Sequence, residues 1–264
     1  MKHLKRKKNP ESYSERAYRR LVSTTGLVST KVCVEETDLH ILAGSDVVVQ
    51  ATDLILQYRA QLQKYIVKNP HFCASLDPLS TDNIVPPLIR DMLKAGEAAG
   101  VGPMAAVAGT IAEYVGNGLV EAGHGEVMVE NGGDIFLLRE HDCTVAVFAG
   151  DSPLSCKVGL RIRSAQMPIG ICTSSGTVGH SLSLGAADSV TVLSRSTPLA
   201  DAVATRLGNE VGRRAETGIA DALAVAGEIP GVIGVVVVCG ERMGAYGDVE
   251  LVGVNLQEEP FNDR

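Results

Sequence analysis

Apolar and polar residues alternate in several short segments of the chain, and this two-residue period predicts β-strands. Two such segments between Lys31 and Leu42 flank the polar run Glu35–Asp38, which predicts a β-hairpin. A second strand–turn–strand unit is expected over 126–138, because its central Asn-Gly-Gly-Asp sequence tolerates positive φ. Further strands are expected at 143–148, 157–163, 168–172, 189–193 and 231–239.

Other segments repeat their apolar residues every three to four positions, which predicts amphipathic helices. These helices are expected at about 46–69, 87–99, 103–122, 199–213 and 216–227. The first would begin near Ser45 or Asp46 and end before Pro70, and the second would end at Gly100. The proline-rich segment 70–87 between them is expected to be an irregular connection.

Strands outnumber helices in this pattern and do not alternate regularly with them. The pattern therefore favours an α+β fold with a mixed or antiparallel sheet over a doubly wound fold. The chain has 264 residues, which is enough for one large domain or two small ones. It contains no internal repeat and no linker that divides it clearly.

The charge and composition argue against nucleic-acid binding, secretion and a membrane span. A formal net charge of −7 argues against a nucleic-acid surface, which needs faces rich in Lys and Arg. The basic segment 1–8 lacks the apolar stretch of a signal peptide, so a solvated, disordered tail is expected. The longest apolar run, Val232 to Cys239, is far shorter than the roughly 20 residues of a membrane span.

The cysteines indicate a reducing compartment. They are scattered at positions 33, 73, 143, 156, 172 and 239, and none forms a CxxC pair. Zinc sites and disulfide frameworks both need tighter grouping, so the sequence predicts a reduced, cytoplasmic protein.

One predicted helix, over 103–122, has a face made of small residues: Ala105, Ala106, Ala108, Gly109 and Ala112. Such a face lets another backbone or a ligand approach closely. A helical glycine costs about 1 kcal/mol relative to alanine, so Gly109 and Gly116 need a packing or ligand explanation. Close core packing is the simpler of the two.

Asp201 and Thr205 are candidate metal ligands. They are four residues apart, so they share one face of the helix expected there. A carboxylate and a hydroxyl, completed by phosphate and backbone oxygens, suit Mg²⁺. The alternative is structural: Pro198 is typical of a first helical turn, so Asp201 would only complement the helix dipole.

Three further features could contact a ligand. The turn Asn131–Asp134 can present backbone amides to an anion, although most such turns are only turns. The Gly/Ser-rich segment 174–185 could wrap a phosphate, with His180 as acid, base or hydrogen-bond donor, or it could be a plain surface loop. Cys172 could be a reactive thiol or a buried structural residue. GxGxxG, Walker A, GxSxG and HExxH patterns are absent from the sequence.

Taken in chain order, these motifs resemble those of the ApbE family, whose members use Mg²⁺ to move FMN from FAD onto a protein threonine or to cleave FAD. The matching positions are Gly109 and Glu113, 132–135, Thr173-Ser174 with Gly176, His180, 189–192, and 200–202 with Thr205. The match is closer, and covers nearly the whole chain, to a bacterial and archaeal branch of ApbE-like proteins whose reaction is not established. Its hallmarks stand here at 102–109, 129–136 and 172–181. That branch is associated with sulfur assimilation into homocysteine in anaerobes.

The chain departs from the transferase pattern at three places. Ala108 stands where the transferases usually have Lys, and Glu113 stands where they have Asp. The segment Ser181–Gly185 replaces their Asp-Pro-x-Thr-Gly. The loss of a cation and of a turn argues against FMN transfer and indicates a changed ligand.

The resemblance implies a single ApbE-like α+β domain over 13–264, after a basic, disordered tail over 1–12. It implies a small phosphate-containing ligand, with Mg²⁺ and FAD or FMN as cofactors, and Asp201 and Thr205 as metal ligands. The implied catalytic residues are His180, Glu113 and Asp134, and the implied ligand contacts are Gly132, Gly133, Asp134, Thr173, Ser174, Ser175 and Gly176. A homodimer is expected only because it is the commonest assembly.

Three hypotheses for the function follow. The first is an enzyme that performs Mg²⁺-assisted phosphate or pyrophosphate chemistry on a flavin or another nucleotide-like ligand. The second is a sulfur-handling accessory protein with Cys172 as the carrier thiol. The third is a non-catalytic binding or interaction protein that kept the fold and lost the chemistry.

Overall fold

The computed structural model describes residues 26–80, 84–176, 187–212 and 215–254. An eight-stranded sheet has its strands in the order β1 (Val28–Val34), β2 (Thr37–Ala43), β3 (Val127–Asn131), β4 (Asp134–Leu138), β7 (Ile169–Ser174), β8 (Ser189–Ser194), β9 (Val232–Cys239) and β10 (Arg242–Gly247). A three-stranded sheet has the order β11 (Glu250–Gly253), β6 (Val158–Ile162), β5 (Cys143–Ala146). All neighbouring strands are antiparallel.

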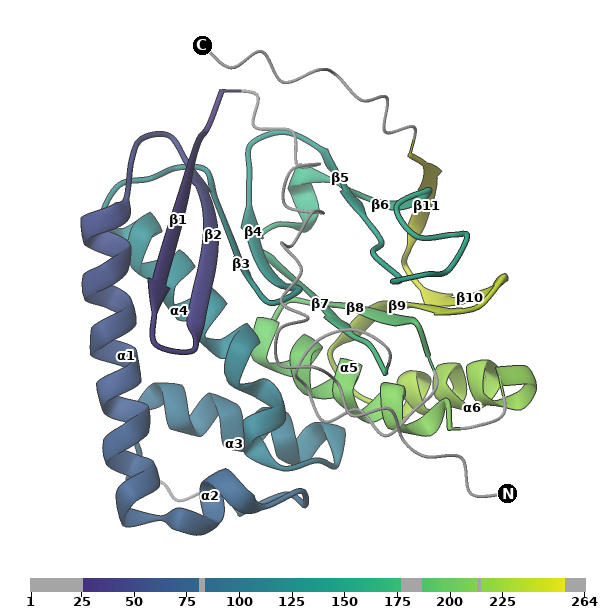
Figure 1. Ribbon diagram of the computed structural model, residues 1–264, viewed down its shortest axis with the longest axis horizontal. Helices are drawn as coiled ribbons and strands as arrows, with labels where there is room; N and C mark the ends of the chain where they lie inside the picture. Colours follow the sequence, from purple (N-terminus) through teal and green to yellow (C-terminus); the bar gives the residue numbers. More distant parts are fainter. Residues whose placement is uncertain (1–25, 81–83, 177–186, 213–214, 255–264) are drawn as a thin grey trace.

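Helices cover one face of the larger sheet, and the smaller sheet lies toward the other face (Figure 1). The helices are α1 (Val48–Lys68), α2 (Pro70–Ala74), α3 (Pro87–Ala99), α4 (Val107–Glu121), α5 (Thr197–Glu210) and α6 (Ala215–Glu228), with 3₁₀ turns η2 (Pro103–Ala106) and η3 (Ser164–Gln166). The α+β prediction with a mixed or antiparallel sheet is confirmed, and the described part of the sheet is antiparallel throughout.

The alternation of residues along each strand produces two separate hydrophobic cores. On β2, Leu39 and Ile41 pack in the core beneath the helices, whereas Leu42 packs in the second core. On β7, Cys172 belongs to the first core and Ile171 to the second. A strand residue therefore faces either the helices or the small sheet, and this decides which side chains can meet α4 and α5.

The local predictions hold where the turn or cap residues are distinctive. The helix α3 has the predicted bounds, and Gly100 ends it in the left-handed conformation with φ 71°. The hairpin β1–β2 is present, and the turn between β3 and β4 has Gly132 at φ 70° and Gly133 at φ 108°. Positive φ at both central residues suits the twist of a two-residue hairpin loop.

Other local predictions were wrong in detail. The segment 70–87 is not wholly irregular, since Pro70 opens the short helix α2 at a position where its missing amide costs nothing. The predicted helix 103–122 is divided into η2 and α4, because Ala106 leaves the helical region with φ −108° and ψ 5°. The strands β10 and β11 were missed, because β10 is mostly exposed and β11 has only four residues.

The helix predicted at 199–213 begins earlier and ends earlier. The Oγ of Ser196 accepts a hydrogen bond from the amide of Leu199, so Ser196 is the N-cap and Thr197 the first helical residue. The last helical residue is Glu210, and Gly212 has φ 55°. The predicted tail 1–12 lies outside the described residues.

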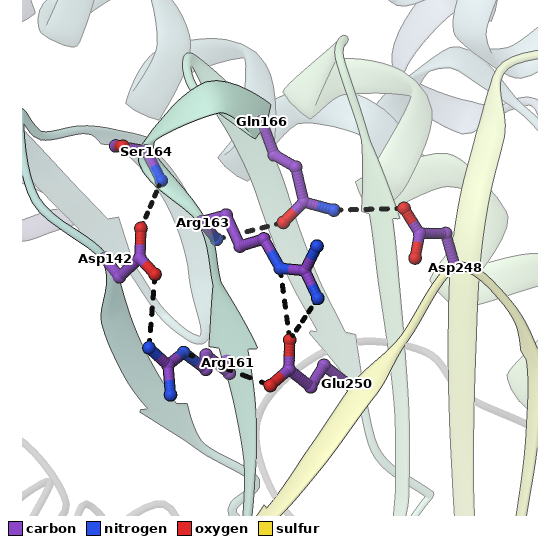
Figure 2. Close-up of polar contacts among 7 residues, drawn as sticks. All are labelled: Asp142, Arg161, Arg163, Ser164, Gln166, Asp248 and Glu250. Carbon is purple, nitrogen blue, oxygen red and sulfur yellow. Dashed lines mark hydrogen bonds and ion pairs between the residues drawn. The ribbon is translucent and has the colours of Figure 1, made fainter.

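Polar contacts connect the strands of the small sheet to one another and to η3 (Figure 2). The carboxylate of Asp142 accepts hydrogen bonds from the amide of Ser164 at 3.0 Å and from Nη2 of Arg161 at 3.3 Å. Arg163 donates to Oε2 of Glu250 at 2.8 Å. These side chains connect β5, β6, η3 and β11, so β11 is held by ion pairs as well as by its strand pairing.

Among the described residues, no helix combines the length and the apolar character that a membrane crossing would require.

Candidate functional site

The helices α4 and α5 approach each other closely at Gly109. A Cβ atom at this position would lie 2.7 Å from the carbonyl oxygen of Thr197 and 2.8 Å from Cβ of Asp201. A methyl group at Gly116 would likewise overlap the ring of Phe136 on β4. Close packing thus explains both glycines, as the simpler of the two sequence interpretations expected.

Asp201 is buried, with 9% of its surface exposed, and points at the start of α4. Its Oδ2 accepts a hydrogen bond of 2.8 Å from the amide of Gly109, in the first turn of that helix. The expectation that Asp201 complements the dipole of its own helix was wrong in this respect. It is the fifth residue of α5 and serves the N-terminus of α4 instead.

Asp134 places a second buried carboxylate close to Asp201. It is the first residue of β4, is 7% exposed, and pairs across the sheet with Cys172. Burial, and next the nearby charge of Asp134, raise the pKa of Asp201 well above its usual range, against the opposing effect of the α4 amides. The structure therefore brings together two of the residues that the sequence selected.

Cys172 lies beneath this carboxylate pair and is fully buried. Its Sγ donates a hydrogen bond of 3.4 Å to the carbonyl oxygen of Thr197. Burial, followed by the charges of Asp134 and Asp201, raises the pKa of the thiol well above its usual range. A reactive thiolate needs an electropositive, partly exposed setting, so the geometry favours the structural interpretation of Cys172.

The helix α5 packs against the strand β7. A Cβ at Gly170 would lie 2.5 Å from Cα of Thr197, and two residues later Cys172 interacts with Asp201. Four helical residues rise about 6 Å and two strand residues about 6.7 Å, so the two periods nearly match. Thr205 follows Asp201 by one turn of α5 and is partly buried.

Ser174 is the last residue of β7 and has an unusual hydroxyl. The side chain is 6% exposed, and in the described structure its buried Oγ has no hydrogen-bond partner. A buried hydroxyl without a partner costs about 1–3 kcal/mol, so its retention suggests a ligand contact.

Three other predicted ligand residues have hydrogen-bond partners within the protein. The hydroxyl of Thr173 shares a 3.0 Å hydrogen bond with that of Thr191, on the opposite face of the sheet from Cys172. The amide of Gly133 donates to Oε1 of Glu130 at 2.8 Å, so a side chain of the protein already engages it. The amide of Gly176 bonds the carbonyl of Ala187 at 3.0 Å.

The remaining predicted residues lie in or near the chain segments after β3 and β7. Ser175 is partly exposed beside Gly176, and Gly132 is exposed in the β3–β4 turn. The predicted acid or base His180 lies outside the described residues. Asn131, which sequence reasoning placed only in the turn, donates from Nδ2 to the carbonyl oxygen of Ala108 at 3.0 Å and so ties the turn to α4.

Glu113 lies on α4 but is engaged at the start of α5. Its Oε2 accepts a hydrogen bond of 2.6 Å from the amide of Thr197. Burial raises the pKa of Glu113, and the hydrogen bonds from Thr197 oppose that shift. Sequence reasoning missed Thr197; the Ser-Thr-Pro sequence at 196–198, typical of a helix start, was the available signal.

The candidate metal ligands at this site suit a hard cation better than a soft one. The carboxylates of Asp134 and Asp201 and the hydroxyls of Thr205 and Ser174 are all oxygen donors, which Mg²⁺ prefers. Within the described residues no group of three or more His, Cys, Asp or Glu side chains could hold a metal on its own. Mg²⁺ commonly uses one or two carboxylates together with phosphate oxygens and water, and this site offers that number.

The order and pairing of these elements define an ApbE-like α+β protein. Solved structures share the fold: the flavinyl transferase ApbE of Pseudomonas stutzeri, in its apo form, aligns over 83% of this chain and 93% of its own with a TM-score of 0.52 and 14% identity. The ApbE protein of Thermotoga maritima aligns over 83% of this chain and 97% of its own, with a TM-score of 0.52 and 11% identity.

The family model described as AbpE bacteria matches residues 19–239, and the chain belongs to this family. A UPF0280 protein of Methanococcus aeolicus is 40% identical over 226 residues, which cover 84% of this chain and 91% of that protein. A UPF0280 protein of Methanosarcina acetivorans is 39% identical over 217 residues, which cover 82% and 85% of the two chains. The recognition of an ApbE-like branch from the sequence is thereby confirmed.

Proposed function

We propose that this protein binds a phosphate-containing, nucleotide-like ligand, with a flavin nucleotide as the first candidate, and performs Mg²⁺-assisted chemistry at its phosphate or pyrophosphate. The observation that carries this proposal is the pair of buried carboxylates, Asp134 and Asp201, at the junction of α4, α5 and β4. Two adjacent buried carboxylates repel each other unless a cation or a proton intervenes. The flavinyl transferase of Pseudomonas stutzeri, which shares this fold, supports the choice of ligand.

Each residue would have a separate role at this junction. Asp201 and Thr205 would hold the cation, and the amide of Gly109 would keep the Asp201 carboxylate in place. Asp134 would supply a second carboxylate to the cation, and the hydroxyl of Ser174 would donate to a ligand oxygen. When bound, Mg²⁺ would polarise a phosphoryl oxygen and offset its charge.

FMN transfer itself is not part of the proposal. Ala108, at the start of α4, carries no charge to place near a phosphate, and its carbonyl oxygen is bonded to Asn131. A sulfur-carrier role for Cys172 is not favoured either, because the thiol is buried and its two carboxylate neighbours disfavour a thiolate. Cytoplasmic location, a homodimer and a link to homocysteine synthesis stay predictions from the sequence.

Binding of FAD and FMN to the full-length protein, with Mg²⁺ and with EDTA, tests the proposal. Flavin fluorescence and calorimetry should detect binding that depends on Mg²⁺ and that weakens by about tenfold or more in Asp201→Asn, since loss of a ligand at such a site costs at least that much. Glu126→Gln is the matched control, because Glu126 accepts a backbone amide at the far end of β3 from this site. No binding of either nucleotide at high micromolar concentration would contradict the proposal.

The products distinguish an enzyme from a binding protein. Incubation with FAD and Mg²⁺, followed by chromatography, should show cleavage at the pyrophosphate that is absent from Asp201→Asn although that variant remains folded. Binding without any turnover would instead support the non-catalytic interpretation of the fold.

A further inference from the structure

Each of the helices α4 and α5 has an amide in its first turn that donates to a carboxylate of the other helix. Glu113 of α4 accepts a hydrogen bond of 2.6 Å from the amide of Thr197, the first residue of α5. Asp201 of α5 accepts a hydrogen bond of 2.8 Å from the amide of Gly109, the third residue of α4. On each helix the carboxylate comes four residues after the donated amide, so the two contacts are reciprocal.

This exchange satisfies groups that a helix cannot satisfy by itself. The first amides of a helix have no acceptor within it and carry the positive end of the helix dipole. A carboxylate from a packed neighbour satisfies both needs at once. Gly109 makes the exchange possible, because a Cβ atom there would push the carbonyl of Thr197 away.

The two contacts together fix how α5 lies on the rest of the molecule. The contact between Glu113 and Thr197 holds the first residue of α5, and Asp201 follows one turn later on the same face. A shift at Thr197 is therefore transmitted to the Asp201 carboxylate, which accepts the amide of Gly109 and interacts with the charge of Asp134.

We infer that Glu113 is a positioning residue, which sets the place of the Asp201 carboxylate by holding the amide of Thr197, and not a general acid or base. The resemblance to the transferases implied a catalytic role for this residue, whereas its observed partner is a backbone amide. The effect on cation affinity rests on the proposed function; the contact between Glu113 and Thr197 does not.

Substitution of Glu113 in the full-length protein separates the two roles. Glu113→Gln retains an oxygen that can accept the Thr197 amide but cannot exchange a proton, and Glu113→Ala removes the acceptor. Calorimetric titration with Mg²⁺ should show affinity reduced by about tenfold or more in Glu113→Ala and within about threefold of wild type in Glu113→Gln, the range expected for groups that orient metal ligands. Glu126→Ala, which removes a comparable acceptor far from the site, should leave the affinity unchanged.

A second measurement keeps the inference testable if the wild-type protein binds no Mg²⁺, a result that contradicts the proposed function alone. Hydrogen exchange at the Thr197 amide should be faster in Glu113→Ala than in wild type and should be restored in Glu113→Gln. Unchanged exchange in Glu113→Ala would overturn the inference. Mg²⁺ affinity lost equally in both variants would also overturn it, because the charge and not the acceptor would then matter.

Discussion

Gly109 is the residue on which the approach of α4 to α5 depends most directly. Alanine is the better helix former by about 1 kcal/mol, yet its Cβ would meet a backbone oxygen at 2.7 Å and the Cβ of Asp201 at 2.8 Å, neither of which can rotate away. Overpacking of this kind costs about 1–3 kcal/mol. We expect Gly109→Ala to lower the free energy of unfolding by up to about 2 kcal/mol in urea titrations, the overpacking cost less the gain in helix propensity.

Gly118 on the same helix is the matched control. A Cβ atom there would meet only the methyl ends of Leu54, which can move aside. Gly118→Ala should therefore be neutral or slightly stabilising. Equal destabilisation by the two substitutions would contradict the packing argument at Gly109.

Cys172 allows a second prediction at the scale of one residue. Its thiol is fully buried beside two carboxylates, whereas Cys33 and Cys73 are exposed. Alkylation at neutral pH should label Cys33 and Cys73 rapidly and Cys172 slowly, with mass spectrometry of peptides as the readout. Rapid labelling of native Cys172 would restore the sulfur-carrier hypothesis.

At the scale of elements, the small sheet depends on the polar contacts around Asp142 (Figure 2). The amide of Ser164, and next the guanidinium of Arg161, lower the pKa of the Asp142 carboxyl. A lowered pKa adds stability above the unfolded value of about 3.9, and that stability is lost as the pH falls through the folded value. Asp142→Asn should therefore lower Tm at neutral pH and have little effect at an acid pH below the lowered pKa of this carboxyl.

Thermal unfolding at both pH values checks this prediction. Asp53→Asn, on an exposed position of α1, is the control and should change Tm little at either pH. A Tm difference for Asp142→Asn that is the same at neutral and acid pH would show that the charge of Asp142 does not contribute.

Elements also show where sequence patterns succeed. The bounds of α3 were predictable because its apolar period, its opening proline and Gly100 all act within a few residues. The division between η2 and α4 was not, because both segments have helix-forming sequences. The break lies at Ala106, which has φ −108° and ψ 5°.

At the scale of the whole molecule, the carboxylates that we propose bind Mg²⁺ should lower the stability of the cation-free fold. Ionised Asp201 is unfavourable in the folded state without a cation, since its pKa is raised. Asp201→Asn should keep an acceptor for Gly109 and relieve the repulsion from Asp134. We expect its Tm in EDTA to equal or exceed that of wild type.

With Mg²⁺ present, the Tm of wild type should exceed that of Asp201→Asn. A ligand that binds only the folded state at one hundred times its Kd adds about 2.7 kcal/mol, so Mg²⁺ should raise the Tm of wild type. It should not raise the Tm of Asp201→Asn. Differential scanning fluorimetry with Mg²⁺ and with EDTA measures both effects. A wild-type Tm that is insensitive to Mg²⁺ would argue against a cation at this position.

The sequence by itself determined the strands and helices whose periods and caps are local, the α+β class, and the family, through the motifs at 102–109, 129–136 and 172–181. It also selected Asp134 and Asp201, because acidic residues beside a turn and in a helix are visible as patterns. Only the tertiary structure decided which of the selected residues meet. Asp201 contacts Gly109, 92 positions away, and Glu113 contacts Thr197, 84 positions away.

The physical reason is that such contacts depend on how helices and strands pack, and packing has no period along the chain. The pleat of β7 sends Thr173 to one face of the sheet and Cys172 to the other, which separates neighbours in the same motif. The packing of α5 on β7 brings Asp201 near Cys172, so the helix motif at 200–205 and the strand motif at 172–176 meet although they are far apart in sequence. The candidate site therefore depends both on the pleat of β7 and on the packing of α5 against that strand.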